Sequence, residues 1–334
     1  MPRGLRTGRT VAEVGEFGLL AQLLPRLPAG PGTIVGPGQD CAVIRCGTRR
    51  LLYTVDALVE GVHFETDWLS PHQLGRKSFL VNASDVAAMG GRPRFIVVSI
   101  GVPPSYRARD LTALHAGVAA AARSCGATVV GGNLTRATQL FISIALLADA
   151  PKRIVTRQGA RPGDRVYVTG TLGDAALGVR LLSTHARHQP AMLPLRRFRE
   201  PSPRLRAGRW LVESGVVSAM IDVSDGLVQD LGHICTESNV GALVRSADVP
   251  LSAAYRKSCA AGDPLALHGG EDYELLYTVP ERNVRRLERN RARLGCPIAC
   301  VGEITAGGGV RVVDAGGKPV ALNVAGYDHF RGRF

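Results

Sequence analysis

The chain has 334 residues, of which 45% are hydrophobic and 21% charged, values typical of a globular protein large enough for two domains. No apolar run approaches the roughly 20 residues of a membrane helix, and Glu13 and Glu16 follow the basic first residues, so no signal peptide is predicted. The net charge of +13 invites a nucleic-acid interpretation, but only 5% of residues are aromatic and they do not alternate with basic ones. Seven dispersed cysteines without a Cys-x-x-Cys pair predict neither a zinc site nor a redox couple. We expect a cytoplasmic protein whose partners include neither a membrane nor a nucleic acid.

Hydrophobic periodicity in the first half of the chain predicts alternating helices and strands. An amphipathic helix is predicted over residues 11–27, where apolar residues recur at helical spacing. Ser70 and Pro71 form a favourable helix start, and the Gly90-Gly91 pair ends that helix. The other elements predicted here are strands at 41–45, 51–55, 95–102, 128–130 and 141–147, and a helix at 108–124.

The pattern restarts near residue 150. The elements predicted after this point are strands at 165–169, 219–223 and 273–279, helices at 174–182, 203–214, 227–238 and 282–294, and a loop at 185–194. Mixed helices and strands in two successive blocks predict two domains of α/β or α+β type, residues 1–150 and 151–334.

Three aspartates in the first block stand where a side chain could contact a ligand. Asp40 follows a glycine-rich turn, Asp56 ends an apolar strand-like run, and Asp85 interrupts an otherwise apolar helix. A buried carboxylate is unfavourable unless it is paired or bound to a metal. Each of these residues taken alone is more simply a cap or turn aspartate.

The segment Asp222-Val-Ser-Asp-Gly226 gives the sharpest signal. Asp222 ends a predicted strand, and Asp225 begins the turn into the next helix. Two carboxylates so close in sequence would repel each other and raise each other's pKa unless a cation lies between them. Hard oxygen ligands on a tight turn suit Mg²⁺, which keeps several waters and bridges to phosphates. An aspartate that merely caps the helix is the alternative.

Two glycine-rich segments are weaker candidates. Gly269-Gly-Glu-Asp-Tyr-Glu274 places acids after a glycine pair that opens a strand, so Glu271 could face a ligand. Gly170-Thr-Leu-Gly-Asp174 connects a strand to a helix and could present N–H groups to phosphate, although ordinary strand–helix packing explains it equally well. His63 and Arg157 are lone polar residues in predicted loops and, without further context, are expected to be exposed to solvent.

Eight short segments, spread in order over nearly the whole chain, carry more information together than any one of them alone. They are Thr54–Asp56, Leu58–Phe64, Val81–Gly90, Gly131–Arg136, Thr156–Asp164, Ile221–Leu227, Gly269–Leu275 and Gly326–Phe330. Together they resemble the thiamine-monophosphate kinase family.

The resemblance implies the aminoimidazole-ribonucleotide-synthetase-like fold, with an N-terminal α/β domain and a C-terminal α+β domain. It also implies a homodimer paired through the N-terminal sheets, with ATP near that interface. The activity it implies is direct transfer of the γ-phosphoryl group of ATP to thiamine monophosphate with the help of several Mg²⁺ ions. Because the acceptor phosphate is already ionised at neutral pH, no catalytic base is expected, and positioning and charge neutralisation carry the rate.

The resemblance also implies roles for individual residues. The metal ligands it implies are Asp40, Thr54, Asp56, Asp85, Asp222 and Asp225, with Asn133 as a further candidate. The nucleotide contacts it implies are Gly132, Asn133, Arg157 and Ser224. The substrate contacts it implies are His63, Glu271 and Tyr327, of which Tyr327 would offer an aromatic face to a cationic ring.

The sequence departs from the family pattern at three positions. Gln39 and Asn133 each stand where the pattern has Asp, and Val55 stands where it has Thr. Amide oxygens can still bind Mg²⁺, but two negative charges and one hydroxyl are lost from the metal-binding end. Two alternatives therefore stay open: an ATP-using relative with another small acceptor, and a nucleotide-binding protein without turnover.

Overall fold

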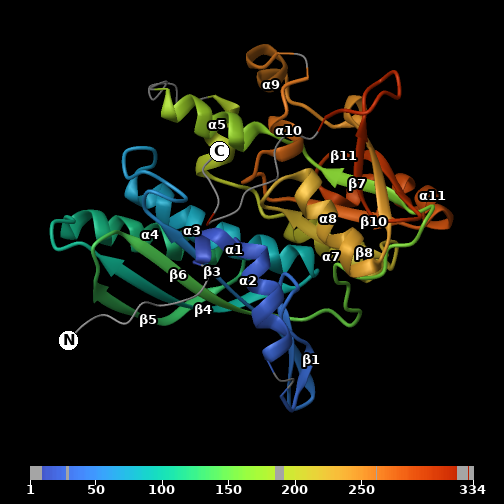
Figure 1. Ribbon diagram of the computed structural model, residues 1–334. Coiled ribbons are helices and arrows are strands. Elements are labelled where there is room, and N and C mark those ends of the chain that lie inside the picture. Colours follow the sequence, from blue (N-terminus) through green and yellow to red (C-terminus); the bar gives the residue numbers. More distant parts are fainter. Residues whose placement is uncertain (1–9, 28–29, 185–191, 261, 322–329, 331–334) are drawn as a thin grey trace.

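The computed structural model describes residues 10–27, 30–184, 192–260, 262–321 and 330, which are arranged around two six-stranded sheets (Figure 1). The first sheet has the strand order β1-β2-β3-β6-β4-β5, and the second has the order β12-β9-β11-β7-β10-β8. Within the described residues, no helix combines the length and the apolar character needed to span a membrane.

The first sheet is covered by helices on one face and open on the other. Its strands are β1 (Thr33–Val35), β2 (Ala42–Cys46), β3 (Arg49–Val59), β4 (Arg92–Val102), β5 (Thr128–Arg136) and β6 (Phe141–Asp149). All pairs are antiparallel except β4 with β5. Helices α3 (Pro71–Ala88) and α4 (Ala108–Ser124) pack together on the covered face (Figure 1). On the open face, the register aligns Tyr53 with Phe95 and Val55 with Val97, and all four side chains are exposed.

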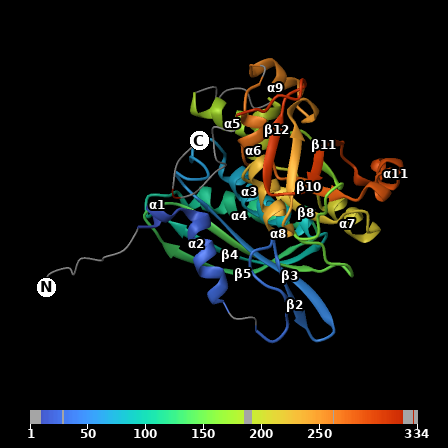
Figure 2. The ribbon, with the colours of Figure 1, turned by 45° about the vertical axis from the view of Figure 1, so that its right-hand side comes forward.

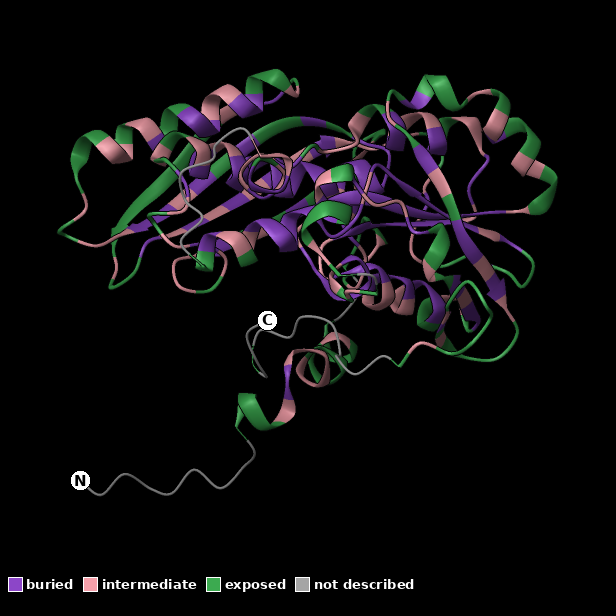
Figure 3. Cartoon of the chain, turned by 90° about the horizontal axis from the view of Figure 1, so that it is seen from above, coloured by how far each residue is buried: buried purple, intermediate pink, exposed green. Residues whose placement is uncertain are grey.

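Helix α3 is the most buried helix of the first block. Ser70 caps it with a reciprocal hydrogen-bonded capping box, and Pro71 occupies its first turn, as predicted. Thirteen of its 18 residues are buried, because it packs on the first sheet and also against α7 (Leu205–Ser214) of the second block. Gly208 of α7 permits this approach, since a Cβ atom there would lie 1.9 Å from the carbonyl oxygen of Ala87. Buried residues therefore run continuously through both blocks in Figure 3.

The second sheet is flanked by helices (Figure 2) and has a hydrophobic cluster on each face. Its strands are β7 (Arg165–Thr169), β8 (Ala219–Val223), β9 (Gly241–Arg245), β10 (Glu274–Val279), β11 (Ile298–Thr305) and β12 (Gly309–Val313). Its helices, besides α7, are α5 (Asp174–Ser183), α6 (Leu193–Arg199), α8 (Leu227–Ser238), α9 (Ala253–Ser258), α10 (Leu265–His268) and α11 (Glu281–Arg289), with 3-10 turns η2 (Ser246–Asp248) and η3 (Arg291–Leu294). Val166 and Val168 of β7 join the cluster with α8, whereas Tyr167 joins the cluster with α7 and α11.

Three of the sequence-based expectations about local structure are wrong. The helix predicted over residues 11–27 is divided into α1 (Val11–Val14), α2 (Glu16–Leu23) and the 3-10 turn η1 (Leu24–Arg26), because Gly15 has φ 75°. Part of the predicted loop 185–194 is helix α6, and residues 185–191 lie outside the described ranges. Asp56 lies inside β3 rather than at the end of a strand. The domain boundary near residue 150 stays a prediction.

Candidate active site

Three of the predicted metal ligands come together at the contact between the two blocks. Asp40 precedes β2, Asp85 lies on α3 and Asp222 lies on β8, yet each offers a carboxylate oxygen within 4.8 Å of the others. Asp40 and Asp222 are buried, with 7% and 3% of their surface exposed. The fold therefore brings together three acids that are far apart in sequence.

The carboxylates of Asp85 and Asp222 lie in surroundings that disfavour their ionised forms. Burial raises the pKa of Asp85 well above its ordinary value, and the charges of Asp56 and Asp222 raise it further. Burial, followed by the charge of Asp40, raises the pKa of Asp222 to about 7. Because these groups disfavour ionisation together, a bound cation would relieve the repulsion.

The donor set fits a hard cation. One oxygen of Asp40, Oδ2, is buried and has no hydrogen-bond partner among the described residues, whereas such atoms are normally satisfied. Its other oxygen, Oδ1, accepts hydrogen bonds from Arg157 Nη2 at 2.7 Å and Nε at 3.3 Å. Carboxylate oxygens in this number are the ligands that Mg²⁺ prefers, and the unpartnered oxygen leaves a lone pair for it.

Neighbouring side chains orient the three carboxylates. Thr54 Oγ1 donates to Asp85 Oδ2 at 2.7 Å, so Thr54 contacts a predicted metal ligand through a hydrogen bond. Ser84 Oγ, also on α3, donates to Asp222 Oδ2 at 2.5 Å. The backbone N–H of Asp56 donates to Asn82 Oδ1 at 3.0 Å, which holds β3 against α3 beside the group.

Asp225 belongs to a different cluster. Its carboxylate lies within 4.8 Å of the carboxylate of Asp230 and of an imidazole nitrogen of His233, and it is not part of the group of Asp40, Asp85 and Asp222. Asp230 Oδ2 accepts the N–H groups of Asp225 and Gly226, both at 3.1 Å, and so holds the turn that leads into α8. Local sequence does not indicate this role of Asp230, because the aspartate lies inside α8 rather than before it.

Gly269–Glu274 packs directly against the Asp222–Asp225 turn. The N–H of Glu271 donates to the carbonyl oxygen of Ser224 at 2.7 Å. A Cβ atom on Gly270 would lie 2.4 Å from the same oxygen, so only glycine permits this contact. The predicted nucleotide contact Ser224 and the predicted substrate contact Glu271 are therefore neighbours.

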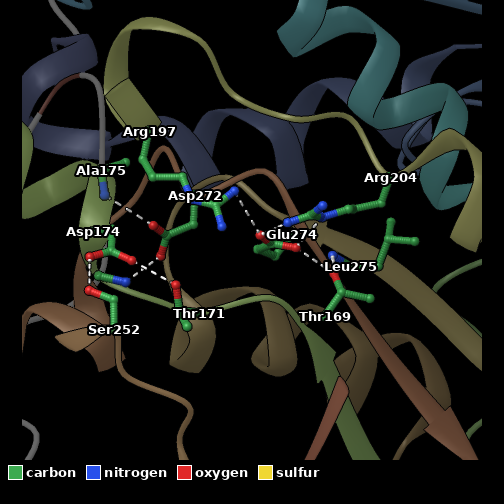
Figure 4. A network of polar contacts seen from close by, with 11 residues as sticks. Thr169, Thr171, Asp174, Ala175, Arg197, Arg204, Ser252, Asp272, Glu274 and Leu275 are labelled. Carbon is green, nitrogen blue, oxygen red and sulfur yellow. Dashed lines mark hydrogen bonds and ion pairs between the residues drawn. The ribbon is translucent and has the colours of Figure 1, made fainter. Parts of the chain in front are cut away.

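The other two acids of this segment are bound within the protein (Figure 4). Asp272 accepts the N–H groups of Gly173 at 2.6 Å and Ala175 at 3.2 Å. Glu274 accepts from Arg204 Nε at 2.6 Å and from Thr169 Oγ1 at 2.6 Å. The N–H groups of Gly173 and Ala175 are thus occupied, and ordinary strand–helix packing is the correct interpretation of Gly170–Asp174.

Lys77 is a residue near the site that the sequence reasoning missed. It is fully buried on α3, and its ammonium group forms an ion pair with Glu271 Oε2. The available signal was a lysine in an apolar helix, in a chain with only four lysines among 41 basic residues. The sequence could not supply its partner, which lies 194 positions away.

The remaining predicted site residues differ in how closely they approach the carboxylates of Asp40, Asp85 and Asp222. His63 and Arg157 are half-buried rather than exposed, and His63 Nδ1 accepts the N–H of Val59 at 3.1 Å. Gly132 on β5 is aligned with Asp56 on β3, but β4 and β6 lie between them, which corresponds to about 14 Å. Within one chain, Asn133 is therefore not brought to the carboxylate group. Tyr327 lies outside the described residues.

Comparison with known proteins identifies the class that this fold and site define. Residues 38–149 match the family described as AIR synthase related protein, N-terminal domain, and residues 161–315 match AIR synthase related protein, C-terminal domain. Thiamine-monophosphate kinase from Escherichia coli K12 is 36% identical over 324 residues, which cover 95% of this chain and 98% of that protein. The enzyme of the same name from Bacillus subtilis 168 is 31% identical over 95% of this chain and 99% of its own. The chain belongs to the thiamine-monophosphate kinase family.

Solved structures agree with this assignment. The complex of AaThiL with AMPPCP and TMP has a TM-score of 0.84 at 33% identity, covering 97% of this chain and 99% of that chain. Thiamine-monophosphate kinase from Stenotrophomonas maltophilia K279a has a TM-score of 0.74 at 32% identity, covering 89% and 96%. The hydrogenase maturation protein HypE from E. coli, at 21% identity over 93% of this chain and 98% of its own, shares the fold with a TM-score of 0.70. The predicted family and fold class are confirmed.

Proposed function

We propose that this protein transfers the γ-phosphoryl group of ATP to thiamine monophosphate, which yields thiamine diphosphate and ADP. The observation that carries the proposal is the meeting of Asp40, Asp85 and Asp222 in a chain whose relatives, over 95% of its length, are thiamine-monophosphate kinases. The complex of AaThiL with TMP and AMPPCP, an ATP analogue that resists hydrolysis, supports both substrates.

Asp40, Asp85 and Asp222 are the residues that would hold Mg²⁺, with Asp56 and Thr54 beside them. Mg²⁺ bound there would neutralise charge on the transferring phosphoryl group. Asp225 is proposed as a ligand at the other end of the same turn, next to Ser224. Gln39 and Val55 supply no charge here, so the proposed site relies on the remaining aspartates.

The chain's own residues bind and orient the two substrates. An ionised oxygen of thiamine monophosphate attacks the γ-phosphorus, the bond to the bridging oxygen breaks, and ADP leaves. Arg157, now paired with Asp40, is proposed to contact the nucleotide, whereas Glu271, His63 and Tyr327 are proposed to contact the acceptor. No side chain needs to remove a proton, because the attacking oxygen already carries its charge.

We also propose that two copies pair through the open face of the first sheet. Tyr53, Val55, Phe95 and Val97 expose a contiguous apolar surface there, which fits a second copy of the same face. Gly132 and Asn133 lie on the edge strand of this sheet, where the nucleotide would be close to the interface. Because its co-substrate is ATP, we propose that the protein acts in the cytoplasm. The division into domains 1–150 and 151–334 is likewise a proposal.

The test is incubation of the purified protein with Mg²⁺, ATP and thiamine monophosphate, followed by chromatographic assay of thiamine diphosphate. We expect stoichiometric thiamine diphosphate and ADP, and no product when EDTA removes Mg²⁺. Consumption of ATP only with a different small acceptor would favour the repurposed relative. Binding of ATP without any turnover would favour a nucleotide-binding protein.

A further inference from the structure

Lys77 is a buried cation that the proposed reaction does not use directly. Its side chain has no exposed surface, whereas the side chain of its partner Glu271 is 16% exposed. The ammonium group also donates to the carbonyl oxygen of Phe198 at 3.0 Å and lies 3.5 Å from the centroid of that ring. Burial lowers the pKa of Lys77, and the charge of Glu271 opposes this shift. A buried charge of this kind is retained only where its partners are well placed.

We propose that Lys77 is a positioning residue for the acceptor, because its ammonium group fixes Glu271 Oε2 and leaves Oε1 to contact thiamine monophosphate. This inference rests on the proposed function, in which Glu271 contacts the acceptor. Among the described residues, the hydrogen bond and the ion pair of the Glu271 side chain both join Oε2 to Lys77. The neighbouring acids Asp272 and Glu274 have both carboxylate oxygens occupied (Figure 4), so Glu271 is the acid of this segment that can bind a ligand.

The backbone around Glu271 also needs an external restraint. Glu271 has φ 73° and Tyr273 has φ 49°, a left-handed backbone conformation that residues other than glycine adopt rarely. Such conformations persist where surrounding contacts fix them and are concentrated at binding sites. The backbone hydrogen bonds from Glu271 to Ser224 and from Tyr273 to Val223 hold the main chain of this segment. Lys77 holds the side chain of Glu271.

Lys77 lies on α3, the helix that also carries Ser84, which contacts the proposed metal ligand Asp222. Ser84 follows Lys77 by seven residues, so the two side chains share one face of α3 about 10 Å apart along its axis. Ser84 donates to Asp222, and Lys77 donates to Glu271. One rigid helix thus fixes the proposed metal site and the proposed acceptor contact relative to each other, which is the geometry that phosphoryl transfer requires.

The choice of lysine is specific for this role. The chain has only four lysines among 41 basic residues, and the other three, Lys152, Lys257 and Lys318, are exposed. An ammonium group is compact and can direct its three donors to a carbonyl, a carboxylate and an aromatic face, whereas a planar guanidinium presents a wider fork. The site therefore selects the smaller cation.

The experiment is a double-mutant cycle of Lys77→Met and Glu271→Gln, with Michaelis constants measured for both substrates. We expect Lys77→Met to raise the KM for thiamine monophosphate about tenfold and to change the KM for ATP less than about twofold. In the Glu271→Gln background, the same change should alter the acceptor KM less than about twofold, because its target is already lost. Lys257→Met, an exposed lysine on α9, is the matched control and should leave both constants unchanged.

Equal changes in both KM values, or full additivity in the double variant, would overturn the inference and make Lys77 a general structural residue. Melting temperature and circular dichroism establish that each variant is folded. If Lys77→Met does not fold, Lys77→Gln, which keeps a donor for the Phe198 carbonyl, enters the same cycle. Wild-type turnover separates the two proposals: no thiamine diphosphate from the wild type removes both, whereas normal wild-type turnover with an unchanged acceptor KM in the Lys77 variant removes only this one.

Discussion

Two places where buried acids lie near the site differ in what neutralises the negative charge. Asp40, Asp85 and Asp222 meet with a single guanidinium, that of Arg157, and one oxygen of Asp40 has no partner among the described residues. Glu274, at a similar depth, meets both Arg204 and Arg197 as well as the hydroxyl of Thr169. The three aspartates carry more negative charge than the protein compensates, whereas the charge of Glu274 is fully compensated by Arg204 and Arg197.

This difference separates the roles of acids that look alike in sequence. An acid whose partners all come from the protein stabilises the fold, since removing it leaves cations unpaired. A group of acids without enough partners destabilises the metal-free fold and gains stability from a cation. Charge balance, rather than burial, therefore distinguishes Asp40, Asp85 and Asp222 from the structural acid Glu274.

The largest expected effect is on turnover at the uncompensated group. Asp222→Asn should lower the formation of thiamine diphosphate by about 10²–10³-fold, because charge neutralisation of the phosphoryl group is lost. The same change should raise the free energy of unfolding in EDTA by on the order of 1–3 kcal/mol, because it removes a repelled charge. Rate assays and urea unfolding in EDTA measure the two effects, and near-normal turnover would show that this group does not bind the metal.

The compensated group should respond in the opposite way. Glu274→Gln leaves Arg204 and Arg197 without their carboxylate, so it should lower the free energy of unfolding by about 3 kcal/mol. Its turnover per folded molecule should stay within about twofold of the wild type. Loss of Mg²⁺-dependent activity at full stability would contradict the structural role of Glu274.

The pH dependence of metal binding sharpens the same contrast. The pKa of Asp222 is raised from 3.8 to about 7, so its contribution to metal-free stability is complete below about pH 3.8 and is lost as the pH rises through about 7. Mg²⁺ binds the deprotonated carboxylate of Asp222, so protons compete with Mg²⁺ for this group more strongly at pH 6 than at pH 8. We expect the increase in melting temperature on adding Mg²⁺ to be larger at pH 8 than at pH 6 in the wild type. In Asp222→Asn this pH dependence should be reduced, and a larger increase at pH 6 in the wild type would be inconsistent with the account.

The smallest expected effect concerns the acids that this chain lacks. Gln39 Oε1 accepts the N–H of Arg157 at 2.8 Å, beside Asp40, whereas Asn133 is three strands away from Asp56. Gln39→Asp should therefore lower the Mg²⁺ concentration for half-maximal rate about two- to fivefold. Asn133→Asp should do so only if the partner's nucleotide lies at this edge strand. A Mg²⁺ titration of the initial rate for each variant decides, and no change with Gln39→Asp would exclude missing charge as a limit on metal binding.

Local sequence signals predicted much of the fold. The helix at 108–124 and the strands at 165–169 and 219–223 were predicted with their observed bounds, because each is bounded by turn residues and has a consistent apolar period. Helix α6 was missed, since it has only seven residues, three of them arginine. The division of the first helix at Gly15 was missed because an apolar pattern continues across the glycine.

The site was predictable only in part, because its contacts are long-range. Asp40, Asp85 and Asp222 were each identified, but their convergence depends on the packing of α3 against the second block. The separation of Asp225 from that group, the occupation of Gly173 N–H by Asp272, and the pairing of Lys77 with Glu271 each join segments or orientations that local sequence does not specify. The family resemblance supplied candidate residues, and the structure supplied their partners.

We propose that Asp40, Asp85 and Asp222 bind the catalytic metal, and binding of Mn²⁺ in place of Mg²⁺, measured by electron paramagnetic resonance in the presence of AMPPCP, tests this proposal. We expect saturable Mn²⁺ binding by the wild type and by Glu274→Gln, and loss of at least one bound ion per chain in Asp222→Asn. Equal numbers and affinities of bound Mn²⁺ in the wild type and in Asp222→Asn would show that these aspartates do not bind the metal.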